Sequence, residues 1–260
     1  MPKVLSKDST AIVFDRSGEG PPIILVVGAF NERPAGAPLA TFLSQHFTVF
    51  NYDRRGRGES GDTAPYAVER EVEDLAALIA EAGGAAAVFG YSSGAILALE
   101  AAARGLAITK LALYEPPYVV GNGEPPESAN HAAHLAELIA AGRRGDAVEY
   151  FQTKMVGIPE DVVAQLRHAP FRPALEAMAH TLVYEAIIVG DGSLPTELAG
   201  GLTVPTLVVA GDASSPFMRV TANALADALP DGQARILEDQ THDIEPSVLG
   251  PVLEAFLAAS

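Results

Sequence analysis

The sequence predicts an α/β protein: a mostly parallel sheet covered by helices on both faces, with a helical segment inserted late in the chain. Short apolar runs rich in Val, Ile and Leu alternate with longer segments of helical periodicity, as in sheets buried on both faces. No strand pattern occurs between 116 and about 204, where only helical patterns recur. A chain of 260 residues is long enough for one large α/β domain with such an insertion.

The strands and helices of the sheet layer follow from these patterns in chain order. Seven apolar runs bounded by turn residues are predicted as strands, at 10–14, 23–27, 47–52, 86–89, 110–114, 206–210 and 234–237. Four segments between and after them have helical periodicity, at 68–81, 95–104, 218–229 and 246–258. In the first of these, Val68, Val72, Leu75, Leu78 and Ile79 recur at the spacing of one helix face.

The segment 116–204 interrupts this alternation. Its helical patterns lie at 129–141, 145–156, 159–168 and 172–189. Paired prolines open the segment, and a Gly-Gly pair followed by Pro205 closes it. We therefore predict a helical cap at 116–204 on a core formed by 1–115 and 205–260. An ordinary helical excursion with no role in a site is the alternative.

The composition excludes several classes of function. Acidic residues outnumber basic ones by 33 to 17, the net charge is −16, and no cluster of Lys or Arg offsets it. Such a chain repels nucleic acid and anionic membranes. Cysteine is absent, which removes disulfides, thiol catalysis and thiolate metal sites. We expect a small-molecule substrate and no nucleic-acid or membrane partner, in a monomer or homodimer.

We expect no export signal at the start of this sequence. Residues 1–8 lack the apolar core of a signal peptide, and the longest apolar stretch, 23–30, is too short to span a bilayer. A cytoplasmic location is therefore expected, and the absence of cysteine fits a reducing compartment.

Residues 90–94, Gly-Tyr-Ser-Ser-Gly, carry the main catalytic candidate. They join the predicted strand 86–89 to the predicted helix 95–104. A sharp turn of this kind holds the oxygen of Ser92 up at the sheet edge as a nucleophile, and its glycines let neighbouring backbone pass close by. The N–H of Ser93 then lies at a helix N-terminus, where it favours a developing negative charge. A glycine-rich turn with a capping serine is the structural alternative.

This segment resembles the nucleophile elbow of the α/β-hydrolase superfamily, and other stretches match that superfamily in order. Residues 23–29 look like its strand and oxyanion turn, and 52–60 are similar to its Asp-x-Arg-Gly-x-Gly-x-Ser turn. Residues 205–211 look like the strand that follows the cap, and 241–243 like the histidine loop. The likeness covers nearly the whole chain outside 116–204, and it implies the α/β-hydrolase fold with a Ser-His-acid triad.

The oxyanion turn departs from the superfamily pattern at one position. Many members carry His-Gly there, whereas Val27 stands in place of that His. The resemblance implies that the N–H of Ala29, or alternatively that of Phe30, is the second oxyanion donor beside Ser93. A backbone donor does not depend on the missing His, so we expect the oxyanion hole to survive.

Six histidines are available as a general base. His242 lies in the loop between the last predicted strand and the last predicted helix, and sites in such sheets lie beyond the C-terminal ends of the strands. The superfamily pattern also places its base here. His131 and His134 share a helical face in the predicted cap, but no third ligand is evident, so no metal site is expected.

Two strand-end carboxylates are candidates for the acid that orients His242. Asp212 follows the strand on which the superfamily most often places its acid, but the usual position on that strand is occupied by Ser214. Glu115 directly follows an earlier strand, at a position where some haloalkane dehalogenases carry a glutamate acid. The two prolines after Glu115 stiffen the chain as it leaves the sheet. We favour Glu115 and keep Asp212 as the alternative.

The predicted chemistry is acyl transfer to water. Ser92 attacks a carbonyl while His242 takes its proton, and water then hydrolyses the acyl-enzyme. A cap implies a covered, apolar pocket, so we expect a small, largely apolar ester, lactone or related acyl substrate. No metal, nucleotide or flavin motif is visible, so no cofactor is expected.

Two alternatives stay open. Cofactor-free perhydrolysis or C–C bond hydrolysis uses the same residues, and a non-hydrolytic or weakly active ligand-binding or biosynthetic protein keeps the same shape. Six large cap side chains are candidates to line the pocket, although such residues are also typical of plain core: Phe151, Met155, Phe171, Met178, Leu182 and Tyr184.

Overall fold

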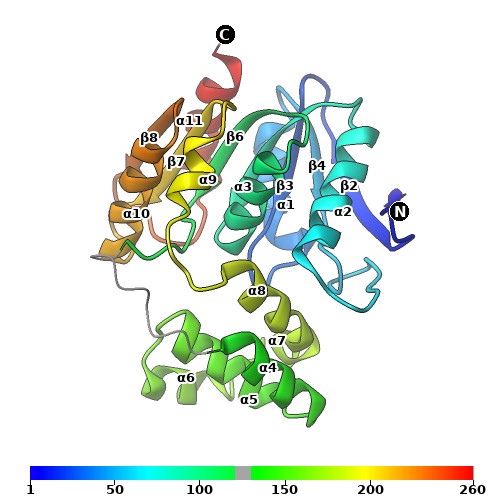
Figure 1. The fold of residues 1–260 in the computed structure, drawn as a ribbon, viewed down its shortest axis with the longest axis vertical. Coiled ribbons are helices and arrows are strands. Elements are labelled where there is room, and N and C mark those ends of the chain that lie inside the picture. Colours follow the sequence, from blue (N-terminus) through cyan, green and yellow to red (C-terminus); the bar gives the residue numbers. More distant parts are fainter. Residues whose placement is uncertain (121–129, 260) are drawn as a thin grey trace.

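The computed structural model describes residues 1–120 and 130–259 and has an eight-stranded sheet at its centre (Figure 1). The strand order is β1-β2-β4-β3-β5-β6-β7-β8. β2 pairs antiparallel with both β1 and β4, and every other neighbouring pair is parallel. The strands are β1 (Lys3–Leu5), β2 (Ala11–Ser17), β3 (Pro22–Val26), β4 (Thr48–Tyr52), β5 (Ala86–Tyr91), β6 (Ile108–Tyr114), β7 (Thr206–Gly211) and β8 (Gly232–Leu237).

The predicted α/β class is confirmed, and each of the seven predicted strands is present with slightly different ends. β1 was not predicted. It is an edge strand of 3 residues whose central side chain alone is partly buried, so it leaves no apolar pattern in the sequence.

Helices cover both faces of the sheet. α1 (Arg33–Leu43) and α11 (Pro246–Ala258) pack on one face, and α2 (Val68–Glu81), α3 (Ser93–Ala103) and α10 (Pro216–Ala228) pack on the other. Along β3, Ile23 and Leu25 point into the first layer while Ile24 and Val26 point into the second. This alternation explains the continuous apolar runs, because a central strand here has no solvent face.

One helix of this layer, α1, is absent from the sequence prediction. Pro34, Gly36 and Pro38 fall within it and interrupt any helical pattern in the sequence. Pro34 is tolerated because it stands in the first turn, where backbone N–H groups have no intrahelical partner.

Between β6 and β7 the described residues are mainly helical. The helices are α4 (His131–Ala140), α5 (Arg144–Tyr150), α6 (Glu160–Leu166), α7 (Arg172–Ala177), α8 (Leu182–Val189) and α9 (Thr196–Gly200). A π-helical turn, Phe151–Met155, continues α5, and a 3₁₀ turn, Ala179–Thr181, separates α7 from α8. The predicted helical run 172–189 is therefore broken, at a point where the Thr181 hydroxyl donates to the Met178 carbonyl and competes with the helix ladder. Residue 129 of the first predicted run lies outside the described residues.

The inserted helices pack in two groups. Apolar side chains of α4, α5 and α8 form a cluster of their own, against which Ala29 and Phe30 of the sheet layer pack. Figure 1 shows α4 to α7 grouped beyond one end of the sheet. α9 and Leu202 instead pack with α3 and α10 in the main core, so the packing changes before residue 204, where the predicted cap ends. Within the described residues, no helix has both the length and the apolar composition needed to cross a bilayer.

Candidate active site

The predicted site residues lie at the C-terminal edge of the parallel strands. Ser92 follows β5, Glu115 follows β6, and His242 lies in the loop after β8. This edge is where parallel sheets carry their sites, because loops from several strands meet there. A cavity of about 380 Å³ opens between them, and its wall includes all but one of the predicted site residues: Ala29, Phe30, Ser92, Ser93, Glu115 and His242. The residue outside this wall is Asp212.

Ser92 occupies a strained turn between β5 and α3. Its φ of 56° and ψ of −126° are uncommon for a residue with a side chain and cost of order 1–3 kcal/mol. Two backbone hydrogen bonds hold it: its N–H donates to the Tyr114 carbonyl at 2.9 Å, and its carbonyl accepts from the Ala95 N–H at 2.9 Å. A side chain at Gly94 would meet the carbonyl oxygen of Val26, so glycine is needed for α3 to begin this close to β3.

His242 is paired with Glu115. The His242 Nδ1 atom lies 2.6 Å from Glu115 Oε2, and the second carboxylate oxygen accepts from the Gly211 N–H at 2.9 Å. The Glu115 side chain is fully buried, whereas that of His242 is 42% exposed. With Glu115 ionised, Nδ1–H is the donor, which leaves Nε2 as a proton acceptor. The Tyr114 hydroxyl donates to the Thr241 carbonyl at 2.6 Å and anchors the histidine loop to β6.

The structure separates the two candidate acids. Asp212 is exposed, and its Oδ1 accepts from the Asp239 N–H at 2.7 Å. Glu115, and not Asp212, meets His242.

The Glu115 carboxyl is held in its charged form. Burial works to raise its pKa, but the hydrogen bonds from His242 and the Gly211 N–H outweigh burial and keep that pKa below the usual value.

This shift predicts an acid-dependent loss of stability. The folded-state pKa of Glu115 lies below its unfolded-state value of about 4.3, so the stabilisation is complete above that pH and is lost as pH falls through the folded-state value. Urea unfolding followed against pH should therefore show the wild-type free energy of unfolding falling more steeply below about pH 4.3 than that of Glu115→Gln. Parallel curves for the two proteins would contradict the shift.

The turn after β3, which the sequence predicts to be the oxyanion turn, is held by side-chain donors on three successive carbonyls. The donors are Arg54 to Val27 at 3.2 Å, Arg57 to Gly28 at 2.7 Å and Asn31 to Ala29 at 2.8 Å. In a trans peptide the C=O and the next N–H share a plane and point in opposite directions. Holding these carbonyls therefore also fixes the N–H groups of Ala29 and Phe30, the two predicted donors.

The same turn touches Ser92. A Cβ placed on Gly28 would lie 2.9 Å from the Ser92 Cβ, so only glycine lets the turn approach the serine this closely. Phe30 adopts a φ of 60°, a second strained residue at the site, and its ring packs edge-on against Phe151 of the insertion.

Four buried charges lie behind the oxyanion turn. Arg54 makes a two-pronged ion pair with Glu71 of α2, at 2.7 and 2.8 Å, and Arg57 contacts Glu185 of α8. Arg54 also reaches Glu185, at 3.0 Å. Each of these four side chains is at most 2% exposed. This charge cluster connects the oxyanion turn, the sheet layer and the insertion.

Comparison with known proteins identifies the family of this chain. The sequence profile of the alpha/beta hydrolase family matches residues 23–250, which include the cavity-lining residues. The chain belongs to this family.

Individual relatives extend over nearly the whole chain. An alpha/beta hydrolase from Sphaerobacter thermophilus DSM 20745, known from a crystal structure, is 54% identical with a TM-score of 0.92, covering 99% of this chain and 100% of that one. The pimeloyl-[acyl-carrier protein] methyl ester esterase of Xylella fastidiosa (strain 9a5c) is 26% identical over 245 residues, 85% of this chain and 87% of the esterase. The enol-lactonase from Burkholderia xenovorans LB400 is 25% identical with a TM-score of 0.70, covering 99% of this chain and 100% of that one.

The insertion supplies part of the cavity wall of this alpha/beta hydrolase, but only two of the six predicted cap residues line the cavity. Of the six candidates, Phe151 and Met155 line it. Phe171 is half exposed, Leu182 is buried among the inserted helices, and Tyr184 stacks on Tyr66 with ring centroids 3.9 Å apart. Met178 is buried away from the cavity wall. Other lining residues were missed because nothing in their spacing marks them: Gln152, Val156, Ile158, Val189, Phe217 and Met218.

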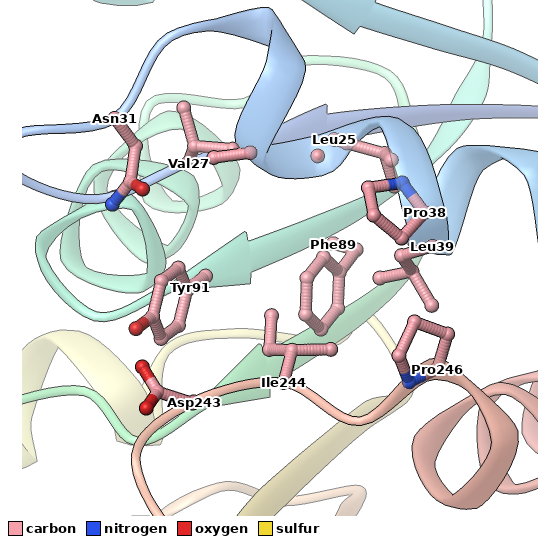
Figure 2. A pocket seen from close by; sticks show the side chains of 12 residues that line it. Leu25, Val27, Asn31, Pro38, Leu39, Phe89, Tyr91, Asp243, Ile244 and Pro246 are labelled. Carbon is pink, nitrogen blue, oxygen red and sulfur yellow. The ribbon is translucent and has the colours of Figure 1, made fainter.

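A second, smaller cavity of about 240 Å³ shares Asn31 and Tyr91 with the first (Figure 2). It lies between α1 and the histidine loop, and Figure 2 shows the Tyr91 hydroxyl facing the Asp243 carboxylate. Burial, with Asp243 and Glu115 nearby, raises the pKa of Tyr91, so this residue stays a neutral hydroxyl. The Tyr91 ring also lies 5.0 Å from that of His242 and supports the histidine from behind.

Within the part of the chain that the structure describes, the two histidines on one helical face belong to no group of three or more potential metal ligands. His131 Nδ1 lies 2.9 Å from the Tyr150 hydroxyl, and the His134 ring packs on the same tyrosine.

Proposed function

We propose that this chain is a serine hydrolase that cleaves small, largely apolar esters or lactones through an acyl-enzyme. The observation that carries the proposal is the 2.6 Å pairing of His242 with the buried Glu115 on the wall of a cavity that also holds the strained Ser92. A pairing of this kind gives the histidine the tautomer that a general base needs.

The proposed first step is the attack of Ser92 Oγ on the substrate carbonyl. His242 Nε2 accepts the hydroxyl proton, and Glu115 stabilises the imidazolium that forms. His242 then gives that proton to the leaving oxygen of the alcohol, and the acyl group stays on Ser92 as an ester. Water repeats the sequence, with His242 as base, and releases the acid.

The proposed oxyanion donors are the N–H groups of Ser93 and of Ala29 or Phe30. Ser93 is the first residue of α3, so its N–H has no carbonyl one turn earlier to bond. The N–H groups of Ala29 and Phe30 are fixed by the side chains that hold their peptide planes. Donors fixed before the reaction need no reorganisation as charge develops on the carbonyl oxygen.

The substrate class follows from the cavity and from the relatives. The wall of the cavity is mainly apolar, which favours a substrate with a neutral acyl group of modest size. One relative is a methyl ester esterase and another an enol-lactonase, which supports ester and lactone substrates for this chain. We also propose that the inserted helices act as a cap, since Phe151, Met155 and Val156 supply part of the wall. A cytoplasmic location and the oligomeric state stay predictions.

Labelling with a fluorophosphonate probe tests this function. The wild-type protein should be labelled, and Ser92→Ala should lose both labelling and p-nitrophenyl ester hydrolysis, by about 10³-fold or more. Ser44→Ala, at the end of α1, is the matched control and should behave as wild type. If wild type is not labelled while folded Ser92→Ala still binds ligand, the chain is a binding protein of hydrolase shape instead.

A further inference from the structure

Gln152 is a buried polar residue on the wall of the active-site cavity. Gln152 is 6% exposed, and its Oε1 atom has no hydrogen-bond partner among the residues that the structure describes. A buried amide without a partner lowers the stability of the folded state, and an apolar residue of similar size would avoid that cost. Such a group in a substrate cavity therefore points to a partner that arrives with the substrate.

A π-helical turn presents Gln152 to the cavity. The turn, Phe151–Met155, follows α5, and the Thr153 hydroxyl donates to the carbonyls of Glu149 and Tyr150, at 2.8 and 3.2 Å. Hydrogen bonds of this type bend helices, and π-helical turns occur often at functional sites. The wider turn places Phe151, Gln152, Met155 and Val156 together on the cavity wall.

The rest of the wall restricts what can bind there. No Lys or Arg lies among the described residues that line the cavity, and the chain carries a net charge of −16. An anionic substituent would find no counter-ion, and the Glu115 carboxylate already binds His242 and Gly211. The partner of Gln152 is therefore an uncharged group. A hydroxyl both donates and accepts, so it satisfies either orientation of the amide.

We infer that Gln152 determines specificity by binding an uncharged hydroxyl group of the substrate, away from the scissile carbonyl. The inference rests on the proposed function and narrows its substrate class to hydroxylated esters or lactones. An apolar substrate that fills the same space leaves the amide oxygen without a hydrogen-bond partner, so it binds less well than a hydroxylated one.

The test compares paired esters. Each p-nitrophenyl ω-hydroxyalkanoate, from a series long enough not to cyclise, is matched with the isostere that ends in a methyl group. In the first series the hydroxyl is on the acyl part of the ester. In a second series the hydroxyl is on the alcohol part of the ester instead. In one of the two series, wild type should prefer the hydroxyl ester by roughly tenfold in kcat/KM. Gln152→Leu should lose that preference, because it cannot hydrogen-bond the hydroxyl ester and no longer places an unpaired amide against the methyl-terminated ester, and it should melt at a higher temperature.

Gln165→Leu is the matched control, since Gln165 is exposed on α6 and does not line the cavity. It should keep the wild-type preference, and Gln152→Met should repeat the result of Gln152→Leu. An unchanged preference in Gln152→Leu, in both series, overturns the inference but leaves the proposed function standing. If wild type and Ser92→Ala hydrolyse all of the esters at the same rate, both the inference and the proposed function are overturned.

Discussion

Glu115→Gln is expected to lower kcat for p-nitrophenyl esters by about 10⁴-fold without unfolding the protein. The reason lies in the second oxygen of Glu115, which accepts from the Gly211 N–H at 2.9 Å. A glutamine must keep its carbonyl oxygen there, so it turns its NH₂ group toward His242. Nδ1 then has to accept rather than donate, the proton moves to Nε2, and the histidine no longer takes the proton of Ser92.

Asp212→Asn is the matched control for this experiment. Its carboxylate is exposed and accepts from Asp239, so the variant should keep nearly wild-type turnover. Circular dichroism and thermal melting show whether both variants are folded. A loss of several orders of magnitude in Asp212→Asn, with little change in Glu115→Gln, would make Asp212 the acid and refute our assignment.

Most of the fold could be predicted from the sequence, because buried strands and buried helix faces appear in the sequence as apolar patterns. Central strands such as β3 are covered on both faces, so they appear as continuous apolar runs. α2 was predicted from its apolar spacing with the ends that the structure gives it. α1 was missed because Pro34 and Gly36 break the pattern, while its stability comes from packing on β4 and α11.

From the sequence alone, the carboxylate partner of His242 could be narrowed to Glu115 and Asp212, but the choice between these two could not be made. Glu115 and Asp212 both follow parallel strands that are neighbours in the sheet, so both end at the same edge. Their side chains point in different directions because of local backbone conformation: Glu115 has a φ of 48°, which turns it out of the strand direction. A single side chain's direction depends on such dihedral angles, which no spacing rule encodes.

The cavity wall was the least predictable part of the site. Helical periodicity identifies buried residues, and Leu182 is buried as its pattern implies, but burial among helices and exposure to a cavity leave the same apolar signature. Gln152 gave no signal at all, since a polar residue in a helical segment is normally solvent-exposed. The contact between Arg57 and Glu185 joins positions 128 residues apart, and only the fold brings them together.

Glu185→Gln is expected to reduce the free energy of unfolding by about 3–5 kcal/mol. The change keeps the shape of the side chain but removes its charge, so Arg54 and Arg57 are left with Glu71 as the one carboxylate of the charge cluster. An unpaired charge in a fully buried site is far more costly than the loss of a surface pair. Urea unfolding measures the effect, and Glu160→Gln, which breaks an exposed pair with Lys154, should leave the unfolding free energy nearly unchanged.

The double variant Arg57→Met/Glu185→Met separates stability from positioning of the oxyanion turn. Removing both charges together leaves no unpaired ion from this pair, so most of the lost stability should return. The Gly28 carbonyl, however, still lacks the Arg57 donor that fixes the peptide plane of Ala29. A stable double variant with reduced kcat and little change in KM therefore indicates that the charge cluster orients an oxyanion donor. Full recovery of both stability and kcat would limit the cluster to a structural role and leave the Ala29 N–H independent of Arg57.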